Sequence, residues 1–294
     1  MGHPEHPYMI QLESSTACDA SCLFCHRPKM KRPGGTMSRW VFEKILHDAK
    51  ELNISEIVIF LCGEPFLFPD VFKWLQRLRE ERCTTAIFTN AAHLDAEKAR
   101  MLVGYSDVVH HVVFSLAGID SESYERIMGL SFERVMENVE YFLDVNNREI
   151  RTVAHMPCFS QTTSFVDAWR EYWVGKMDEV SPTPMFNYAG LVHDPLERTE
   201  NEQQKKFYCD RLNHLMILWD GRVVLCCWDA EGQVVLGDVK IQSLRQVFYG
   251  DIAKRYRKLH SEGRFSELPL CTSCNSNILC LPDIGRVKKE RGLV

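Results

Sequence analysis

The sequence lacks the features that would place the protein in a membrane, outside the cell or on nucleic acid. Its longest apolar runs, such as 57–62, are far shorter than the roughly 20 residues of a membrane-spanning helix. The first residues do not form a secretion signal, because no basic stretch is followed by an apolar one. Lysine and arginine number 35, aspartate and glutamate 40, so the net charge of −5 offers no overall basic field. We expect a cytoplasmic protein whose partners include neither a membrane nor a nucleic acid.

What the sequence has in abundance is cysteine, with twelve in 294 residues. Without a secretion signal, clustered cysteines are typical of metal binding or redox chemistry rather than of disulfides. Most of them form two groups near the ends of the chain. The first group is Cys18, Cys22 and Cys25, the second is Cys209, Cys226, Cys227, Cys271, Cys274 and Cys280, and Cys62, Cys83 and Cys158 lie between them as expected packing residues.

Between the two groups, strand-like and helix-like segments alternate, which is typical of a parallel sheet with helical crossovers. About six such units fit, too few for a closed barrel of eight. We predict an α/β fold in which residues 1–192 form an open, partial (β/α)6 barrel; a flat, doubly wound sheet is the alternative. The expected strands are 8–12, 57–62, 84–89, 108–116, 150–156 and 185–188, and the expected helices are 38–52, 69–81, 95–103, 132–145 and 165–174.

The last hundred residues have a different pattern. After a polar, linker-like stretch at 193–206, two apolar segments flank Asp220 and Gly221. This dipeptide supplies the positive φ of a tight primed turn, so a β-hairpin is expected over 215–226. One helix is expected at 243–260. We predict a small C-terminal domain over 193–294.

The first cysteine group follows the first expected strand. Three thiolates at the spacing of Cys18, Cys22 and Cys25 can hold three irons of a [4Fe–4S] cluster and leave the fourth iron open to a ligand. A zinc ion with His26 as its fourth ligand is the alternative. The basic run 27–32 is expected to be a solvated loop.

This CxxxCxxC spacing, with Phe24 just before the third cysteine, resembles the radical S-adenosylmethionine (SAM) superfamily. Further resemblances follow the ends of later strands, where such folds build active sites. Gly63-Glu64-Pro65 resembles the GGEP motif, with Cys62 in place of the first glycine. Thr89-Asn90 resembles the TNG element, with Ala91 in place of glycine. Residues 113–118 resemble the ISLDG element, with Ala117 in place of aspartate.

The resemblance implies a site and a reaction. Cys18, Cys22 and Cys25 would hold the [4Fe–4S] cluster, and its open iron would bind SAM. An external one-electron donor of the flavodoxin or ferredoxin type would drive reductive cleavage of SAM to a 5′-deoxyadenosyl radical, which takes a hydrogen atom from the substrate. The residues implied to contact SAM are Phe24, Gly63, Glu64, Pro65, Asn90 and Ser115.

The second cysteine group resembles the SPASM/Twitch extension of the same superfamily, with Gly221 at the matching position. The full SPASM form has two further cysteines, whereas none follows Cys280 here. The resemblance therefore implies one auxiliary [4Fe–4S] cluster, and zinc bound by four cysteines is the alternative. The implied ligands are Cys209, Cys226, Cys271 and Cys274, with Cys280 as an alternative ligand.

Cys227 directly follows one of these ligands, at a position where sulfatase-maturating members have an aspartate base. It is a candidate hydrogen-atom donor to a substrate radical, or a buried neighbour in the hairpin. A thiol donor would give epimerisation, whereas loss of an electron to the auxiliary cluster would give dehydrogenation.

We therefore predict a biosynthetic oxidoreductase, a radical SAM enzyme that dehydrogenates or epimerises a small molecule such as a sugar or aminocyclitol. The first strand is expected to start at Tyr8, which leaves no room before it for a peptide-recognition domain. The alternatives are a maturase of ribosomally made (RiPP) peptides and a nucleotide- or base-modifying radical SAM enzyme. Outside the enzymes, the alternative is a zinc-binding interaction protein.

Overall fold

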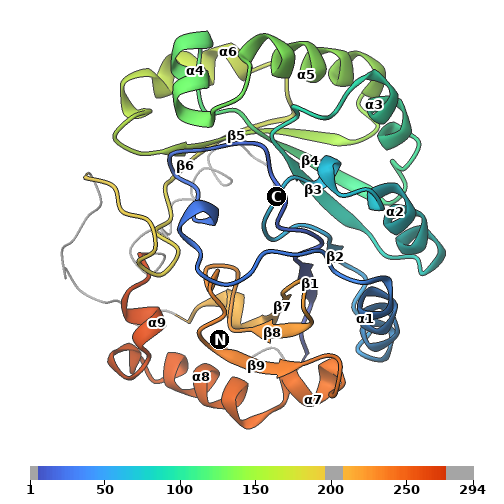
Figure 1. The fold of residues 1–294 in the computed structure, drawn as a ribbon, viewed down its shortest axis with the longest axis vertical. Helices are drawn as coiled ribbons and strands as arrows, with labels where there is room; N and C mark the ends of the chain where they lie inside the picture. The colour runs from blue at the N-terminus through green and yellow to red at the C-terminus, as the bar shows by residue number, and fades with distance from the viewer. Residues whose placement is uncertain (1–5, 196–207, 276–294) are drawn as a thin grey trace, which may run out of the picture.

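The computed structural model describes residues 6–195 and 208–275. Six parallel strands form an open, curved sheet with helices on its outer face (Figure 1). They run in sequence order, since β2 continues to β3 through hydrogen bonds such as Ile57 N to Thr84 O at 2.9 Å. The predicted α/β partial barrel is confirmed. The strands are β1 (Met9–Leu12), β2 (Ile57–Val58), β3 (Thr85–Thr89), β4 (Val109–Ser115), β5 (Arg151–Cys158) and β6 (Glu179–Pro184).

The barrel helices place one apolar face against the sheet. Helix α1 begins where the Ser38 side chain accepts a hydrogen bond from Val41 N, as a capping serine does. Its buried Phe42 stacks on Trp74 of α2 at 3.8 Å between ring centroids. The barrel helices are α1 (Arg39–Glu51), α2 (Val71–Glu80), α3 (Ala96–Val103), α4 (Ser121–Met128), α5 (Phe132–Asn146) and α6 (Val166–Trp173).

The strand expected at 185–188 is wrong, because the last barrel strand is β6 at Glu179–Pro184. Strand propensity does not predict β6, because the strand contains two prolines. They are tolerated because β6 is the last strand of its sheet, where a missing backbone N–H breaks no ladder. The second expected strand is also shorter than predicted, since only Ile57 and Val58 pair. Helix α4 was not expected.

The C-terminal segment extends the barrel sheet. Strand β7 pairs in parallel with β1, with Met9 opposite His214 and Leu12 opposite Ile217. Strands β8 and β9 add to it in antiparallel fashion, next to short helices (Figure 1). The division at residue 192 remains a prediction. The C-terminal elements are β7 (His214–Ile217), β8 (Arg222–Val224), β9 (Val235–Asp238), α7 (Leu244–Phe248), α8 (Asp251–Ser261) and α9 (Pro269–Thr272).

Two details of this segment differ from expectation. The hairpin exists, but its turn has three residues closed by Leu218 N to Arg222 O at 2.9 Å. Only Gly221, at φ +93°, has a positive φ there, so the turn is not the two-residue primed type. The single helix expected at 243–260 is two helices, because the chain breaks at Gly250, which precedes α8.

No helix in the two described stretches is both long and apolar enough to cross a lipid bilayer.

Candidate active site with two groups of cysteines

The first cysteine group lies in the loop that leaves the carboxyl end of β1. Backbone bonds from Ser21 N to Met128 O and from Leu23 N to Ile127 O fix this loop on the end of α4. Burial raises the pKa of the Cys18 thiol to about 11, and it raises the pKa of Cys22 and Cys25 as well. The three side chains are therefore neutral thiols unless a bound cation stabilises them as thiolates.

Gly63 brings the turn after β2 against this loop. Its φ is +87°, and a Cβ there would lie 2.3 Å from the Ser15 carbonyl oxygen, so only glycine fits. The next backbone N–H, that of Glu64, donates to Ala17 O at 2.7 Å. The buried Pro65 then begins a 3-10 turn (Pro65–Leu67). The close approach positions Glu64 beside the cysteine loop.

The Glu64 carboxylate is buried and accepts three hydrogen bonds. They come from Thr89 Oγ1 at 2.7 Å, Asn90 N at 2.9 Å and Phe66 N at 3.2 Å. Burial, the largest cause, raises the pKa of Glu64 to about 7 despite these bonds. A carboxylate offers about four acceptor positions, so one remains for a further donor.

Asn90 joins the end of β3 to the cysteine loop. Its Nδ2 lies 3.4 Å from Asp19 Oδ1 and 3.9 Å from Cys18 Sγ. Ser115 lies at the end of β4, on the same edge of the barrel. The ring of Phe24 packs edge-on against Phe159, with 5.8 Å between centroids. The structure thus brings Cys18, Glu64 and Asn90 into one network.

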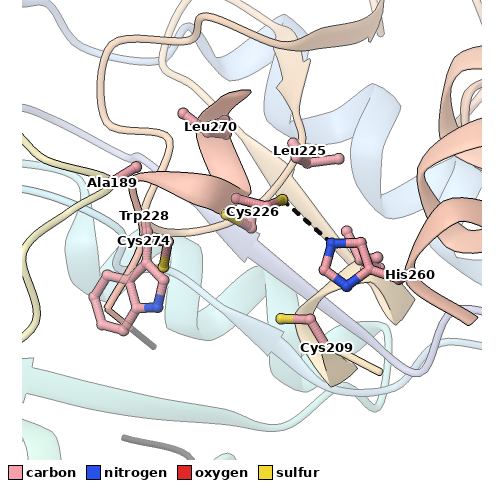
Figure 2. A pocket seen from close by; sticks show the side chains of 10 residues that line it. Ala189, Cys209, Leu225, Cys226, Trp228, His260, Leu270 and Cys274 are labelled. Atoms are coloured by element: carbon pink, nitrogen blue, oxygen red, sulfur yellow. Dashed lines mark hydrogen bonds between the residues drawn. The ribbon is translucent and has the colours of Figure 1, made fainter. Parts of the chain in front are cut away.

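Four cysteines of the second group line one pocket (Figure 2). They come from three separate segments: Cys209 precedes a 3-10 helix, Cys226 follows β8, and Cys271 and Cys274 belong to α9 and the turn after it. Most other lining residues are apolar, namely Ala189, Leu212, Leu225, Leu270 and Trp228. Cys280 lies outside the described residues.

Cys227 lies outside the lining of this pocket. It packs against a small apolar cluster of Met216, Leu218 and Val224. Burial is the main cause that raises the pKa of its thiol, and a hydrogen bond from the Arg211 side chain opposes that rise. The side chain is therefore held as a protonated thiol.

Residues that no sequence motif marked connect the two groups. The Tyr188 ring lies 4.1 Å from the ring of His26, next to Cys25, and 5.0 Å from that of Trp228, which lines the second pocket. The preceding Asn187 exchanges hydrogen bonds with Asn275: Asn187 N to Asn275 Oδ1 is 3.0 Å and Asn275 N to Asn187 Oδ1 is 3.2 Å. The segment after β6 is thereby attached to the end of the CxxC turn.

The basic run 27–32 is only in part the solvated loop that we expected, since Lys29 and Lys31 are exposed whereas Arg27 and Arg32 are partly buried. Arg32 forms an ion pair with Glu13, and their side chains are 5% and 0% exposed. Lys31 N donates to Glu231 Oε1 at 2.6 Å, and the Arg27 guanidinium donates to Ala20 O at 2.7 Å. The run attaches the cysteine loop to the C-terminal segment, because Lys31 N donates to Glu231 and Arg32 Nε donates to Ala230 O, partners 200 and 198 positions away in sequence.

The described cysteines do not form a preformed tetrahedral zinc site. Around one tetrahedral zinc, sulfur atoms lie about 3.8 Å apart, given Zn–S bonds of about 2.3 Å. In the described part of the chain, the one group of three metal-binding side chains with ligand atoms all within 4.8 Å is His47, Asp48 and Glu51 on α1. Among the described residues, no three cysteine sulfur atoms meet that limit. None of the cysteines in these stretches forms a disulfide.

Two family models match the chain. Residues 12–163 match the radical SAM superfamily, and residues 209–275 match SPASM, an iron–sulfur cluster-binding domain. The first match covers more than half of the chain, which therefore belongs to the radical SAM superfamily. The radical SAM match implies a [4Fe–4S] cluster with SAM, and the SPASM match implies an auxiliary iron–sulfur cluster.

Relatives of known function are distant. The S-adenosyl-L-methionine-dependent 2-deoxy-scyllo-inosamine dehydrogenase of Niallia circulans is 20% identical over 275 residues, 91% of this chain and 92% of the relative. The structure of BtrN in complex with AdoMet and 2-DOIA is similar, with a TM-score of 0.66 at 17% identity and coverage of 91% and 92%. Streptococcus suis SuiB bound to precursor peptide SuiA gives 0.71 at 18% identity, covering 94% of this chain and 71% of SuiB. At these identities the solved structures show the fold alone.

Proposed function

We propose that this radical SAM enzyme is a dehydrogenase of a small polyhydroxylated molecule, such as a sugar or aminocyclitol. The observation that carries the proposal is the second pocket, where four cysteines converge. Four thiolates complete the protein ligands of a four-iron cluster, so no position stays open for substrate and the site suits electron transfer. Dehydrogenation needs such an acceptor, because a substrate radical formed by loss of one hydrogen atom must still lose one electron and one proton.

In this proposal Cys18, Cys22 and Cys25 hold the first cluster. When bound, that cluster and SAM supply the radical that takes the first hydrogen atom. Glu64 uses its remaining acceptor position for the amino group of SAM, and the three bonds from its neighbours keep the carboxylate oriented. The remaining residues that we assign to the SAM site are Phe24, Gly63, Pro65, Asn90 and Ser115.

The sequence relative supports a small molecule. The match to the inosamine dehydrogenase extends over 91% of this chain and 92% of that enzyme, whose name gives a small-molecule substrate. Epimerisation is the second candidate, since Cys227 is held as a protonated thiol. Dehydrogenation is favoured because four cysteines converge on the second pocket, whereas Cys227 lies outside its lining and packs against an apolar cluster.

The test is a reaction in heavy water with 2-deoxy-scyllo-inosamine and a panel of related cyclitols and sugars. The protein is reconstituted anaerobically with iron and sulfide and supplied with SAM and a one-electron reductant. A product lighter by one hydrogen molecule is expected. A product of unchanged formula with one carbon-bound deuterium, absent with Cys227→Ala, would establish epimerisation instead. Modification of a peptide and of no small molecule would overturn the substrate class.

A matched pair of variants tests the role of the second pocket. Cys226→Ala removes one of its four thiols and is expected to abolish the oxidised product while SAM is still cleaved to 5′-deoxyadenosine. Cys83→Ala removes a buried cysteine that packs in the barrel core and is expected to retain the product. Full oxidation by the Cys226 variant would exclude this pocket from the reaction.

A further inference from the structure

The second pocket contains a histidine that belongs to neither cysteine motif. His260 lies in the last turn of α8 and is 2% exposed. Its ring faces the pocket, and its Nε2 lies 3.2 Å from the Sγ of Cys271 (Figure 2). The remaining described lining is almost entirely cysteine and apolar side chains. His260 therefore supplies a ring nitrogen to the sulfur of a predicted ligand.

The chemistry of the sulfur fixes the direction of this contact. A cysteine that binds iron is a thiolate, which can only accept a hydrogen bond. Nε2 of His260 must then carry the proton and donate it to the sulfur. The Phe265 ring packs edge-on against the imidazole, with 4.8 Å between centroids. In these apolar surroundings the hydrogen bond is electrostatically stronger than it would be in water.

We propose that His260 raises the reduction potential of the auxiliary cluster by donating this hydrogen bond to Cys271. Reduction adds one electron and breaks no bond, and part of the added negative charge resides on the thiolate sulfurs. A donor at a sulfur stabilises the reduced form more than the oxidised form, which shifts the potential upward. The role is one of tuning and positioning. It depends on the auxiliary cluster and not on the identity of the substrate.

The experiment isolates the auxiliary cluster. In a Cys18→Ala, Cys22→Ala, Cys25→Ala background the N-terminal cluster is absent, so an anaerobic redox titration followed by electron paramagnetic resonance reports one centre. His260→Phe removes the donor, and His260→Gln keeps an N–H at a similar reach. We expect the phenylalanine variant to lower the ratio of reduced to oxidised cluster several-fold at a fixed potential, where tenfold equals about 59 mV for one electron. Glutamine should restore most of the ratio.

Phe265→Leu is the matched control, because it loosens the packing around the imidazole and keeps the donor. It is expected to leave the midpoint potential unchanged. An unchanged potential in an iron-loaded His260→Phe protein would overturn the proposal. So would an equal shift in the Phe265→Leu protein, which would assign the effect to packing.

If the phenylalanine variant does not hold iron, the triple-alanine protein with His260 intact decides the question. With nitrogen-15 histidine, pulsed resonance of the reduced cluster should show a weak coupling to one histidine nitrogen. No coupling, or a coupling as strong as that of an iron-bound nitrogen, would overturn the proposal. None of these readouts uses a substrate, so they remain valid even if dehydrogenation is not the reaction.

Discussion

At the scale of single residues, Gly63 determines how closely the turn after β2 approaches the cysteine loop. Gly63→Ala would place a Cβ 2.3 Å from one carbonyl oxygen and 2.8 Å from another, so the backbone must move. We expect SAM affinity to fall about tenfold or more, equivalent to at least about 1.4 kcal/mol, as Glu64 moves with the turn. Equilibrium binding of SAM to the reconstituted protein measures this loss.

Gly175 provides the matched control for that variant. Its φ is +85°, nearly that of Gly63, but a Cβ there would meet nothing within 4 Å. Gly175→Ala should therefore cost about 1–2 kcal/mol in backbone strain and leave SAM binding as in the parent. Equal loss of SAM affinity in both variants would show that the backbone strain at a positive φ, and not the contact with the cysteine loop, causes the loss.

Glu64 gives a prediction about pH. Its folded-state pKa of about 7 lies above the ordinary 4.5, so the folded protein binds this proton more tightly than the unfolded chain. The stabilisation is complete below pH 4.5 and is lost as the pH rises to 7, at up to about 1.4 kcal/mol per pH unit. Urea unfolding of the iron-free protein should show the parent losing stability relative to Glu64→Gln across this range. A relative gain in the parent would contradict the assignment.

At the scale of elements, the bonds between Asn187 and Asn275 attach the segment after β6 to the CxxC turn. Both residues are buried, so Asn187→Ala leaves polar groups without partners, at a cost of about 1–3 kcal/mol. Because the lost hydrogen bonds hold Asn275, the residue after Cys274, we expect iron in the auxiliary site to decrease markedly. Iron per chain, measured in the triple-alanine background, is the readout.

The control is Asn146→Ala at the end of α5. Asn146 is also buried and exchanges bonds with the backbone of Ile150, at 2.7 and 3.0 Å, but it lies in the barrel. Stability should fall by a similar amount while the iron content stays at the parent level. Equal iron loss in both variants would mean that the auxiliary site responds to global stability and not to this contact.

At the scale of the whole molecule, the ladder between β1 and β7 makes barrel and C-terminal segment share one sheet. The hydrogen bond from Arg32 Nε to Ala230 O and the Lys31–Glu231 contact add to the interface. We expect the iron-free protein to unfold in urea as one unit, with coincident transitions by circular dichroism and tryptophan fluorescence. Two separated transitions would instead support independent domains divided near residue 192.

The sequence predicted those parts of the site whose residues belong to short motifs. Cys18, Cys22 and Cys25 lie close together along the chain, and Glu64 and Asn90 follow strand ends, so local pattern sufficed. The contacts of Arg32 and Asn187 were not predictable, because their partners Ala230 and Asn275 are 198 and 88 positions away. The contact of His260 was not predictable because the histidine itself belongs to no motif. Strand β6 was likewise not predictable, because its prolines are tolerated only at the edge of the sheet.

The pairing of β1 with β7 also bears on how a cell makes this protein. Lys31 and its partner Glu231 are 200 positions apart, so the ribosome must add the intervening chain before the contact can form. At synthesis rates of about 5–20 residues per second this takes about 10–40 s. During that time one edge of β1 is uncovered and the first cysteines lack part of their support. The N-terminal cysteine loop therefore gains its full set of packing partners only after β7 and Glu231 have been synthesised.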